Sequence, residues 1–138
     1  MIKSTFSTEL PGRFGHVGLL IFRVLVSCLM LTHGVPKLQR LFSGEEIQFA
    51  DPYGLGAVTS LVLAILAEFG CSILIMLGLA TRLATIPLMV TMSTAIIFAH
   101  ENDPFGVKEK PLLFLVCYIF LFMVGAGKFS LDNNLSRR

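Results

Sequence analysis

The sequence predicts an all-α integral membrane protein, a four-helix bundle that forms one domain over residues 1–138. Hydrophobic residues make up 54% of the chain and charged residues only 14%, whereas a soluble domain carries about 25% charged residues. The mean hydropathy is +0.78. The apolar residues fall in long segments near the roughly 17–25 residues that a helix needs to cross a bilayer. The four predicted spans are residues 15–35, 57–79, 83–100 and 111–127.

The glycine, proline and polar residues between these segments support the predicted limits of the spans. The first span is longer than the apolar region of a signal peptide, about 7–15 residues, so we expect it to stay in the protein as a helix. Spans two and three are joined by a tight turn, where Gly78 predicts a helix end. A polar connection precedes the fourth span, and Pro111 lies at its start, where the first helical turn tolerates proline.

The basic residues predict the orientation in the membrane. An even number of spans places both termini on one side, together with the turn at Arg82. Six basic residues lie on that side: Lys3, Arg13, Arg82, Lys128, Arg137 and Arg138. Four lie on the other side: Lys37, Arg40, Lys108 and Lys110. The positive-inside rule therefore predicts that both termini are cytoplasmic.

Two predicted spans each carry one ionisable residue near the centre, Arg23 in the first and Glu68 in the second. Charges within hydrocarbon are costly and usually paired, so we expect these two to meet. One interpretation is a structural ion pair that fixes helix register. The other is a polar centre for a headgroup, a quinone or a proton, in which Arg23 holds an anionic or carbonyl oxygen and Glu68 accepts a proton or hydrogen bond. The sequence leaves both open.

A second polar group is predicted at the outer ends of the helices. His33 and Lys37 close the first span, and His100 closes the third, with Asp103 beyond it. No spacing typical of metal ligands, such as HxxxH or HExxH, is present, so we expect no metal. A site for a quinone or another small molecule is favoured over metal binding. Interfacial histidines satisfied by water or carbonyl groups are the simpler alternative.

Arg82 and Asp132 are predicted at the same cytoplasmic surface, either in contact or as two solvated charges. The cysteines Cys28, Cys71 and Cys117 form no CxxC motif, which favours packing roles over a dithiol centre or a disulfide. No haem, dinucleotide or Fe–S motif is present, so electron transfer would need a bound quinone or a partner's cofactor. A net charge of +2 gives no reason to expect nucleic acid.

Several motifs together resemble the DoxX family. They are HGxxK at residues 33–37, GLxTR at 78–82 and GxGxxSLD at 125–132, together with Arg23 and Glu68 inside the first two spans. The resemblance implies a bacterial inner-membrane four-helix protein, related to DoxD-like subunits of thiosulfate:quinone oxidoreductases and to membrane parts of oxidative-stress complexes. It carries over these candidate positions without roles: Arg23, His33, Lys37, Glu68, Arg82, His100 and Asp132.

The function predicted on these grounds is that of an inner-membrane subunit of a quinone-linked or redox-associated system. It would bind a quinone or a small hydrophobic molecule at a polar intramembrane centre. The alternative is a non-catalytic membrane protein that binds or scaffolds a lipid or a partner membrane protein. The expected partners are the lipid bilayer, a membrane or redox subunit, or a second copy of the chain.

Overall fold

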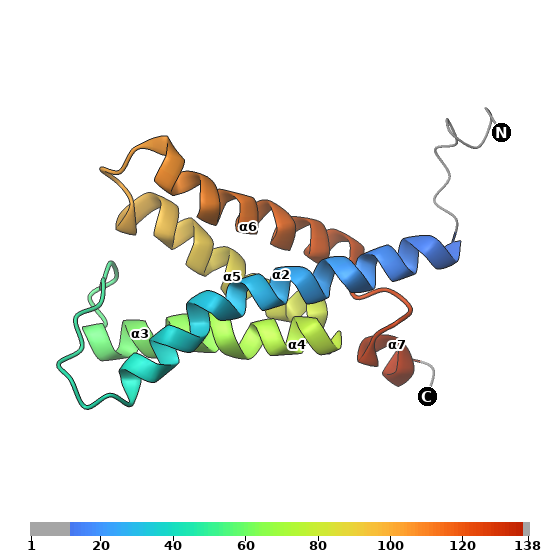
Figure 1. The fold of residues 1–138 in the computed structure, drawn as a ribbon, viewed down its shortest axis with the longest axis horizontal. Coiled ribbons are helices and arrows are strands. Elements are labelled where there is room, and N and C mark those ends of the chain that lie inside the picture. The colour runs from blue at the N-terminus through green and yellow to red at the C-terminus, as the bar shows by residue number, and fades with distance from the viewer. Residues whose placement is uncertain (1–11, 137–138) are drawn as a thin grey trace.

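A computed structural model describes residues 12–136 as helices and connections, without a strand among them. The elements are α2 (Gly12–Leu41), α3 (Ala57–Ile65), η1 (Leu66–Cys71), α4 (Ser72–Leu77), α5 (Thr81–Thr94), η2 (Ala95–Ala99), α6 (Phe105–Val124) and α7 (Leu131–Ser136). The two η elements are π-helical turns: η1 joins α3 and α4 into one continuous helix, and η2 extends α5 to Ala99. The long helices run alternately in opposite directions, and α7 lies at the same end as the start of α2 (Figure 1).

Within residues 12–136, three helices are long and apolar enough to cross a membrane: Gly12–Leu41, Ala57–Leu77 and Thr81–Ala99. They match the first three predicted spans, although α2 continues through Pro36 to Leu41. The fourth predicted span, 111–127, overlaps α6 but not exactly: α6 begins earlier, at Phe105, so that it carries three charged residues in its first turns, and it ends at Val124. The all-helical prediction is confirmed for the described residues. The predicted orientation used Lys3, Arg137 and Arg138, which lie outside them.

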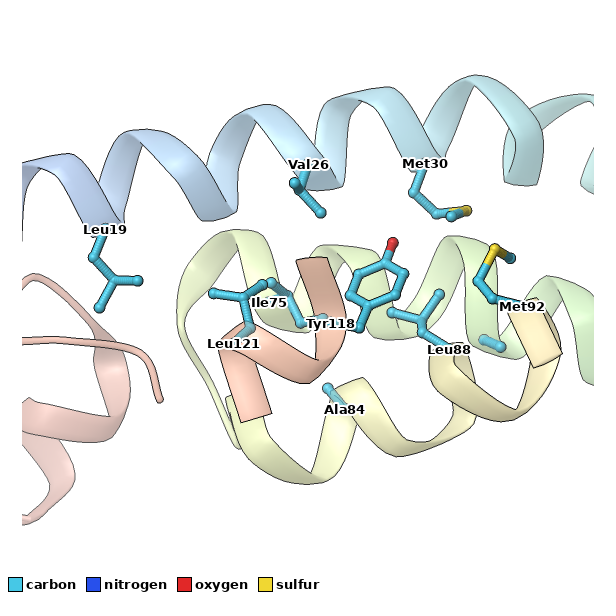
Figure 2. Packing of buried hydrophobic residues seen from close by; sticks show 10 residues of the cluster. Leu19, Val26, Met30, Ile75, Ala84, Leu88, Met92, Tyr118 and Leu121 are labelled. Carbon is cyan, nitrogen blue, oxygen red and sulfur yellow. The ribbon is translucent and has the colours of Figure 1, made fainter. Parts of the chain in front are cut away.

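The core lies where α2 crosses the other long helices. Tyr118 of α6 is its largest fully buried side chain, at 1% exposure. Figure 2 shows the Tyr118 hydroxyl directed toward α2, between Val26 and Met30. Leu88 of α5 and Ile75 of α4 complete the contact, both fully buried. Side chains from all the long helices therefore meet at one centre.

Gly78 ends the second helix, as the sequence predicts. It adopts a left-handed conformation with φ of 70°, which costs glycine little because it has no Cβ. Its amide donates to the carbonyl of Ile75 at 3.0 Å. The chain can therefore turn within three residues, and α5 packs back beside α6 and η1.

Candidate functional site

Arg23 is buried, and it is bound by backbone carbonyls rather than by Glu68. It is 2% exposed. Its Nη1 donates a hydrogen bond to the carbonyl of Ala126 at 3.1 Å, and its Nη2 donates to the carbonyl of Phe129. Both carbonyls belong to the connection between α6 and α7. The predicted Arg23–Glu68 pair is therefore wrong, and Arg23 instead holds the C-terminal segment against the bundle.

The two charges lie at different levels of the bundle. The Arg23 guanidinium lies against Gly78, in the turn that follows α4. The backbone of Glu68 lies against Gly34, further along α2. At a rise of 1.5 Å per residue, the stretch of α2 from Arg23 to Gly34 spans about 16 Å. Arg23 therefore lies at the level of the turn that ends the second helix, whereas Glu68 lies near the middle of that helix.

Glu68 has a different partner, Lys37. The Lys37 Nζ lies 2.5 Å from the Glu68 Oε1. Glu68 is 3% exposed, whereas the Lys37 side chain is 28% exposed. Lys37 also lies over the ring of Phe49, with Nζ 5.6 Å from the ring centroid, within cation–π range. The ion pair thus joins α2 to η1, and a connecting loop covers it.

Close packing of α2 on η1 makes this pair possible. A Cβ built on Gly34 would lie 2.9 Å from the carbonyl carbon of Glu68 and 2.9 Å from the amide nitrogen of Phe69, closer than a real Cβ approaches. Lys37 lies one turn beyond Gly34 on the same side of α2. Glu68 itself belongs to the π-helical turn η1, a distortion that is frequent at functional sites.

Two neighbouring cavities share the ion pair as a common wall. The larger has a volume of about 300 Å³, at the lower end of the roughly 300–1,000 Å³ of small-molecule pockets. Its polar lining residues are Lys37, Tyr53, Ser60, Glu68, Thr91, Thr94 and His100. The smaller cavity, of about 150 Å³, is lined by His33, Lys37, Glu68, His100 and Lys110 among others. Of the predicted binding candidates, only Arg23 lies outside these cavities.

The histidines occupy distinct positions in this site. His100 follows η2 and lines both cavities, and its Nδ1 lies 2.6 Å from the Asp103 Oδ2. His33 lines the smaller cavity, where its ring meets Phe114 edge to face, with centroids 5.9 Å apart. The carboxylate of Asp103 therefore fixes the ring of His100, and packing fixes the ring of His33.

The loop between α2 and α3 covers the larger cavity. Asp51 accepts hydrogen bonds of 2.8 Å from the amides of Leu55 and Gly56 and from the hydroxyl of Ser60. These bonds, with that from Ser60 as the main cause, lower the pKa of Asp51 below its ordinary value. Tyr53 reaches across to α5, with its hydroxyl 2.7 Å from the Thr94 Oγ1. The loop is thereby attached to both walls of the cavity.

Arg82 and Asp132 lie at the opposite end of the bundle and have separate partners. Asp132 accepts hydrogen bonds from the amides of Ala80 and Thr81 at 2.6 and 3.0 Å, so it caps the start of α5. Arg82 donates to the carbonyl of Met123 at 3.2 Å. No ion pair joins Arg82 to Asp132 in the described part of the chain.

Two of the three cysteines contribute to the packing of the bundle. Cys71 and Cys117 are half-buried against the core, Cys28 is exposed, and all three are free thiols. Across residues 12–136, no three His, Cys, Asp or Glu side chains gather as a metal site would require.

The sequence reasoning missed the hydroxyl groups and the loop. Tyr53, Ser60, Thr91 and Thr94 line the larger cavity, but none of them is among the predicted site residues, since isolated hydroxyl residues carry no distinctive motif. For the Lys37–Glu68 pair, by contrast, the sequence does contain an indication. Lys37 lies three residues beyond Gly34 and therefore on the same side of α2, and a long basic side chain there can reach toward the neighbouring helix.

Comparison with known proteins identifies relatives along most of the chain. The DoxX family model matches residues 18–101, a range that includes both residues of the ion pair. "Putative oxidoreductase CatD" of Bacillus subtilis is 33% identical over 119 residues, 84% of this chain and 85% of the relative. "Inner membrane protein YqjF" of Escherichia coli is 32% identical over 127 residues, 88% of this chain and 95% of the relative.

"Uncharacterized membrane protein Rv3486" of Mycobacterium tuberculosis is 30% identical over 139 residues, 90% of this chain and 85% of the relative. No solved structure matches the chain. The family match covers more than half of the sequence, and it agrees with the apolar helices and the printed names of these relatives. The chain is therefore a membrane protein that belongs to the DoxX family.

Proposed function

We propose that this protein is a bacterial inner-membrane subunit of a quinone-linked redox system, and that it binds the ring of a quinone-type molecule in the larger cavity. The observation that carries the proposal is the ion pair of Lys37 with the buried Glu68 in the wall of a cavity of about 300 Å³. Ionisable residues inside membrane segments are costly and mark functional sites by default. A cavity beside such a pair provides the space in which a ligand can contact it.

The cavity suits a flat ring that carries oxygen atoms at its edges. Leu63, Ala64 and Val90 provide apolar wall for the ring and for the start of an isoprenoid tail. Lys37 has three N–H donors, of which Glu68 takes one, so two remain for a ligand oxygen. When bound, a quinone supplies two-electron, two-proton chemistry. The residues of this chain would bind and orient its ring.

The electrons would come from a partner, because the sequence has no haem, dinucleotide or Fe–S motif. One relative, from Bacillus subtilis, carries the word oxidoreductase in its printed name, and a relative from Escherichia coli is named an inner membrane protein. The first name supports a redox-associated role, and the second supports a place in the inner membrane of a bacterium.

The proposed topology has four crossings with both termini in the cytoplasm. The start of α2 and α7 lie at one end of the bundle, as an even number of crossings requires (Figure 1). The fourth crossing would be α6, with its charged first turns, around Lys108 and Lys110, at the outer surface. The larger cavity would then open near the outer face.

Co-purification tests this function. The protein is purified in mild detergent, and its extracted lipids and quinones are quantified by mass spectrometry. We expect quinone in near-stoichiometric amount with the wild type and little with Glu68→Gln, at unchanged helical content by circular dichroism. Glu109→Gln, an exposed carboxylate outside both cavities, is the matched control. Lipid without quinone in the wild type would contradict the proposal and favour a lipid-binding or scaffold protein.

A further inference from the structure

The hydroxyl groups that line the larger cavity already donate their hydrogens to acceptors within the protein. The Ser60 hydroxyl donates to the carboxylate of Asp51 at 2.8 Å. The Thr91 hydroxyl donates to the carbonyl of Pro87 at 2.8 Å, one turn earlier in α5. Carboxylate and carbonyl oxygens only accept hydrogen bonds. Each of these hydroxyl groups therefore has only lone pairs left for a ligand.

Two further lining residues follow the same logic. Thr94 donates to the carbonyl of Val90 at 2.9 Å, so Tyr53, 2.7 Å from the Thr94 oxygen, must be the donor between them. The Nδ1 of His100 faces the carboxylate of Asp103 and so carries the ring hydrogen. In the neutral ring, the Nε2 of His100 is then an acceptor.

Glu68 adds the strongest acceptor of the set. Its Oε1 receives the hydrogen bond from Lys37, but its Oε2 is buried and has no hydrogen-bond partner among the described residues. A buried polar atom without a partner is rare in proteins and calls for an explanation such as an absent ligand or water. Of the side chains that line the larger cavity, Lys37 alone keeps free N–H donors.

From this excess of acceptors, we infer that the larger cavity binds the reduced quinol in preference to the quinone. This inference rests on the proposed function and names the redox form that the site takes. A quinol presents two O–H groups, which can donate to the carboxylate of Glu68, a lining residue of the cavity, and to the free lone pairs of a hydroxyl such as that of Thr91. A quinone presents only carbonyl oxygens, and only Lys37 could donate to them.

The preference has a thermodynamic consequence for the redox couple. A ligand form that binds more tightly is stabilised relative to the other form, so tighter binding of quinol raises the midpoint potential of the bound couple. For a two-electron couple, a tenfold preference corresponds to about 30 mV. The site would therefore bind the quinol that a quinone-reducing partner produces, or favour the reduction of a quinone that is already bound in the cavity.

The test compares binding of the two redox forms to the purified full-length protein in lipid nanodiscs. The probes are decylubiquinone and anaerobically reduced decylubiquinol, with decylhydroquinone and its dimethyl ether as a pair that removes the O–H donors chemically. We expect the O–H form of each pair to bind at least about tenfold more tightly, since hydrogen bonds to charged or buried acceptors discriminate strongly.

Matched variants separate this inference from a general loss of binding. Thr91→Val keeps the side-chain shape but removes the acceptor oxygen, so quinol affinity should fall several-fold while quinone affinity stays unchanged. Thr32→Val is the control, because this hydroxyl also donates to a backbone carbonyl of its helix but does not line the cavity.

The possible outcomes are distinct. Equal affinity for both redox forms, or tighter binding of quinone, would overturn the inference and leave the proposed function standing. Failure of the wild type to bind either form would overturn both. Loss of quinol preference in Thr32→Val as well as in Thr91→Val would also overturn the inference, because the preference would not then arise from the acceptors in the cavity wall.

Discussion

Gly34 of α2 lies directly against the backbone of Glu68, so the two helices that carry the ion pair approach as closely as backbones can. A Cβ at Gly34 would lie 2.9 Å from the Glu68 carbonyl carbon. The neighbour is main chain, which cannot rotate away as a side chain could. This contact sets the distance over which Lys37 reaches Glu68, and with it the shape of both cavities.

Gly34→Ala should therefore separate α2 from η1 and destabilise the protein by about 1–3 kcal/mol, the usual range for overpacking. Gly18→Ala is the matched control, since its Cβ would meet no atom within 4 Å and alanine favours a helix over glycine. Thermal unfolding in detergent, followed by circular dichroism at 222 nm, measures the difference. Equal melting temperatures for the two variants would show that the backbone of Glu68 leaves room for a Cβ at residue 34.

The two members of the ion pair should respond unequally to removal of the partner. Lys37→Met leaves the Glu68 carboxylate buried without its cation and should destabilise the protein by about 3 kcal/mol, the lower end for a broken buried pair. Glu68→Gln should cost less, because the partly exposed Lys37 can turn toward solvent. Combining the two substitutions should recover stability relative to Lys37→Met alone. A double variant less stable than either single one would argue against a direct pair.

Asp132 should stabilise the start of α5 as a cap supplied from a distant part of the chain. Asp132→Ala removes the acceptor for the amides of Ala80 and Thr81 and should cost about 0.5–2 kcal/mol. Asp132→Asn should cost less, since its amide oxygen can still accept one bond. Unfolding of these variants beside Asn134→Ala, an exposed neighbour, measures the effect. A loss of the same size in Asn134→Ala would show that α7 merely tolerates substitution poorly.

Arg23 should hold the segment between α6 and α7 in place. Arg23→Lys keeps the charge but lacks the planar fork that serves the carbonyls of Ala126 and Phe129 together. Amide hydrogen exchange at residues 126–132 should become faster in this variant, while exchange in η1 stays as in the wild type. Arg40→Lys, at an exposed position of α2, should change neither region. Faster exchange throughout the bundle would instead indicate global destabilisation.

The covering loop should respond to acid through Asp51. Its pKa is lowered in the folded protein, so its contribution to stability is complete above the ordinary value of 3.8 and is lost as the pH falls through the folded value. In micelles, the amide resonances of Leu55 and Gly56 should shift together with a midpoint below 3.8. Ser60→Ala should move that midpoint upward. A wild-type midpoint above 3.8 would contradict the hydrogen bonds of this loop.

The sequence alone predicted the helical class, the first three spans and the helix end at Gly78, because apolar length and glycine conformation are local properties. It also singled out Glu68, Lys37, His33 and His100, which line the two cavities, since ionisable residues stand out in and beside apolar segments. The sequence could not predict the partners of Arg23, because they are backbone carbonyl groups, which leave no pattern in a sequence. The assumption that two central charges must meet failed because helix centres need not lie at one level.

Photolabelling is the most direct test that the larger cavity holds a quinone ring. A photoreactive azidoquinone is bound to the wild-type protein in nanodiscs, illuminated, and its attachment sites are mapped by peptide mass spectrometry. Labels should appear in residues 49–64 and 90–100, which line the cavity from the covering loop and from the helices around it, and excess decylubiquinol should abolish them. Labels spread over lipid-facing positions, unchanged by the competitor, would contradict a quinone site beside Lys37 and Glu68.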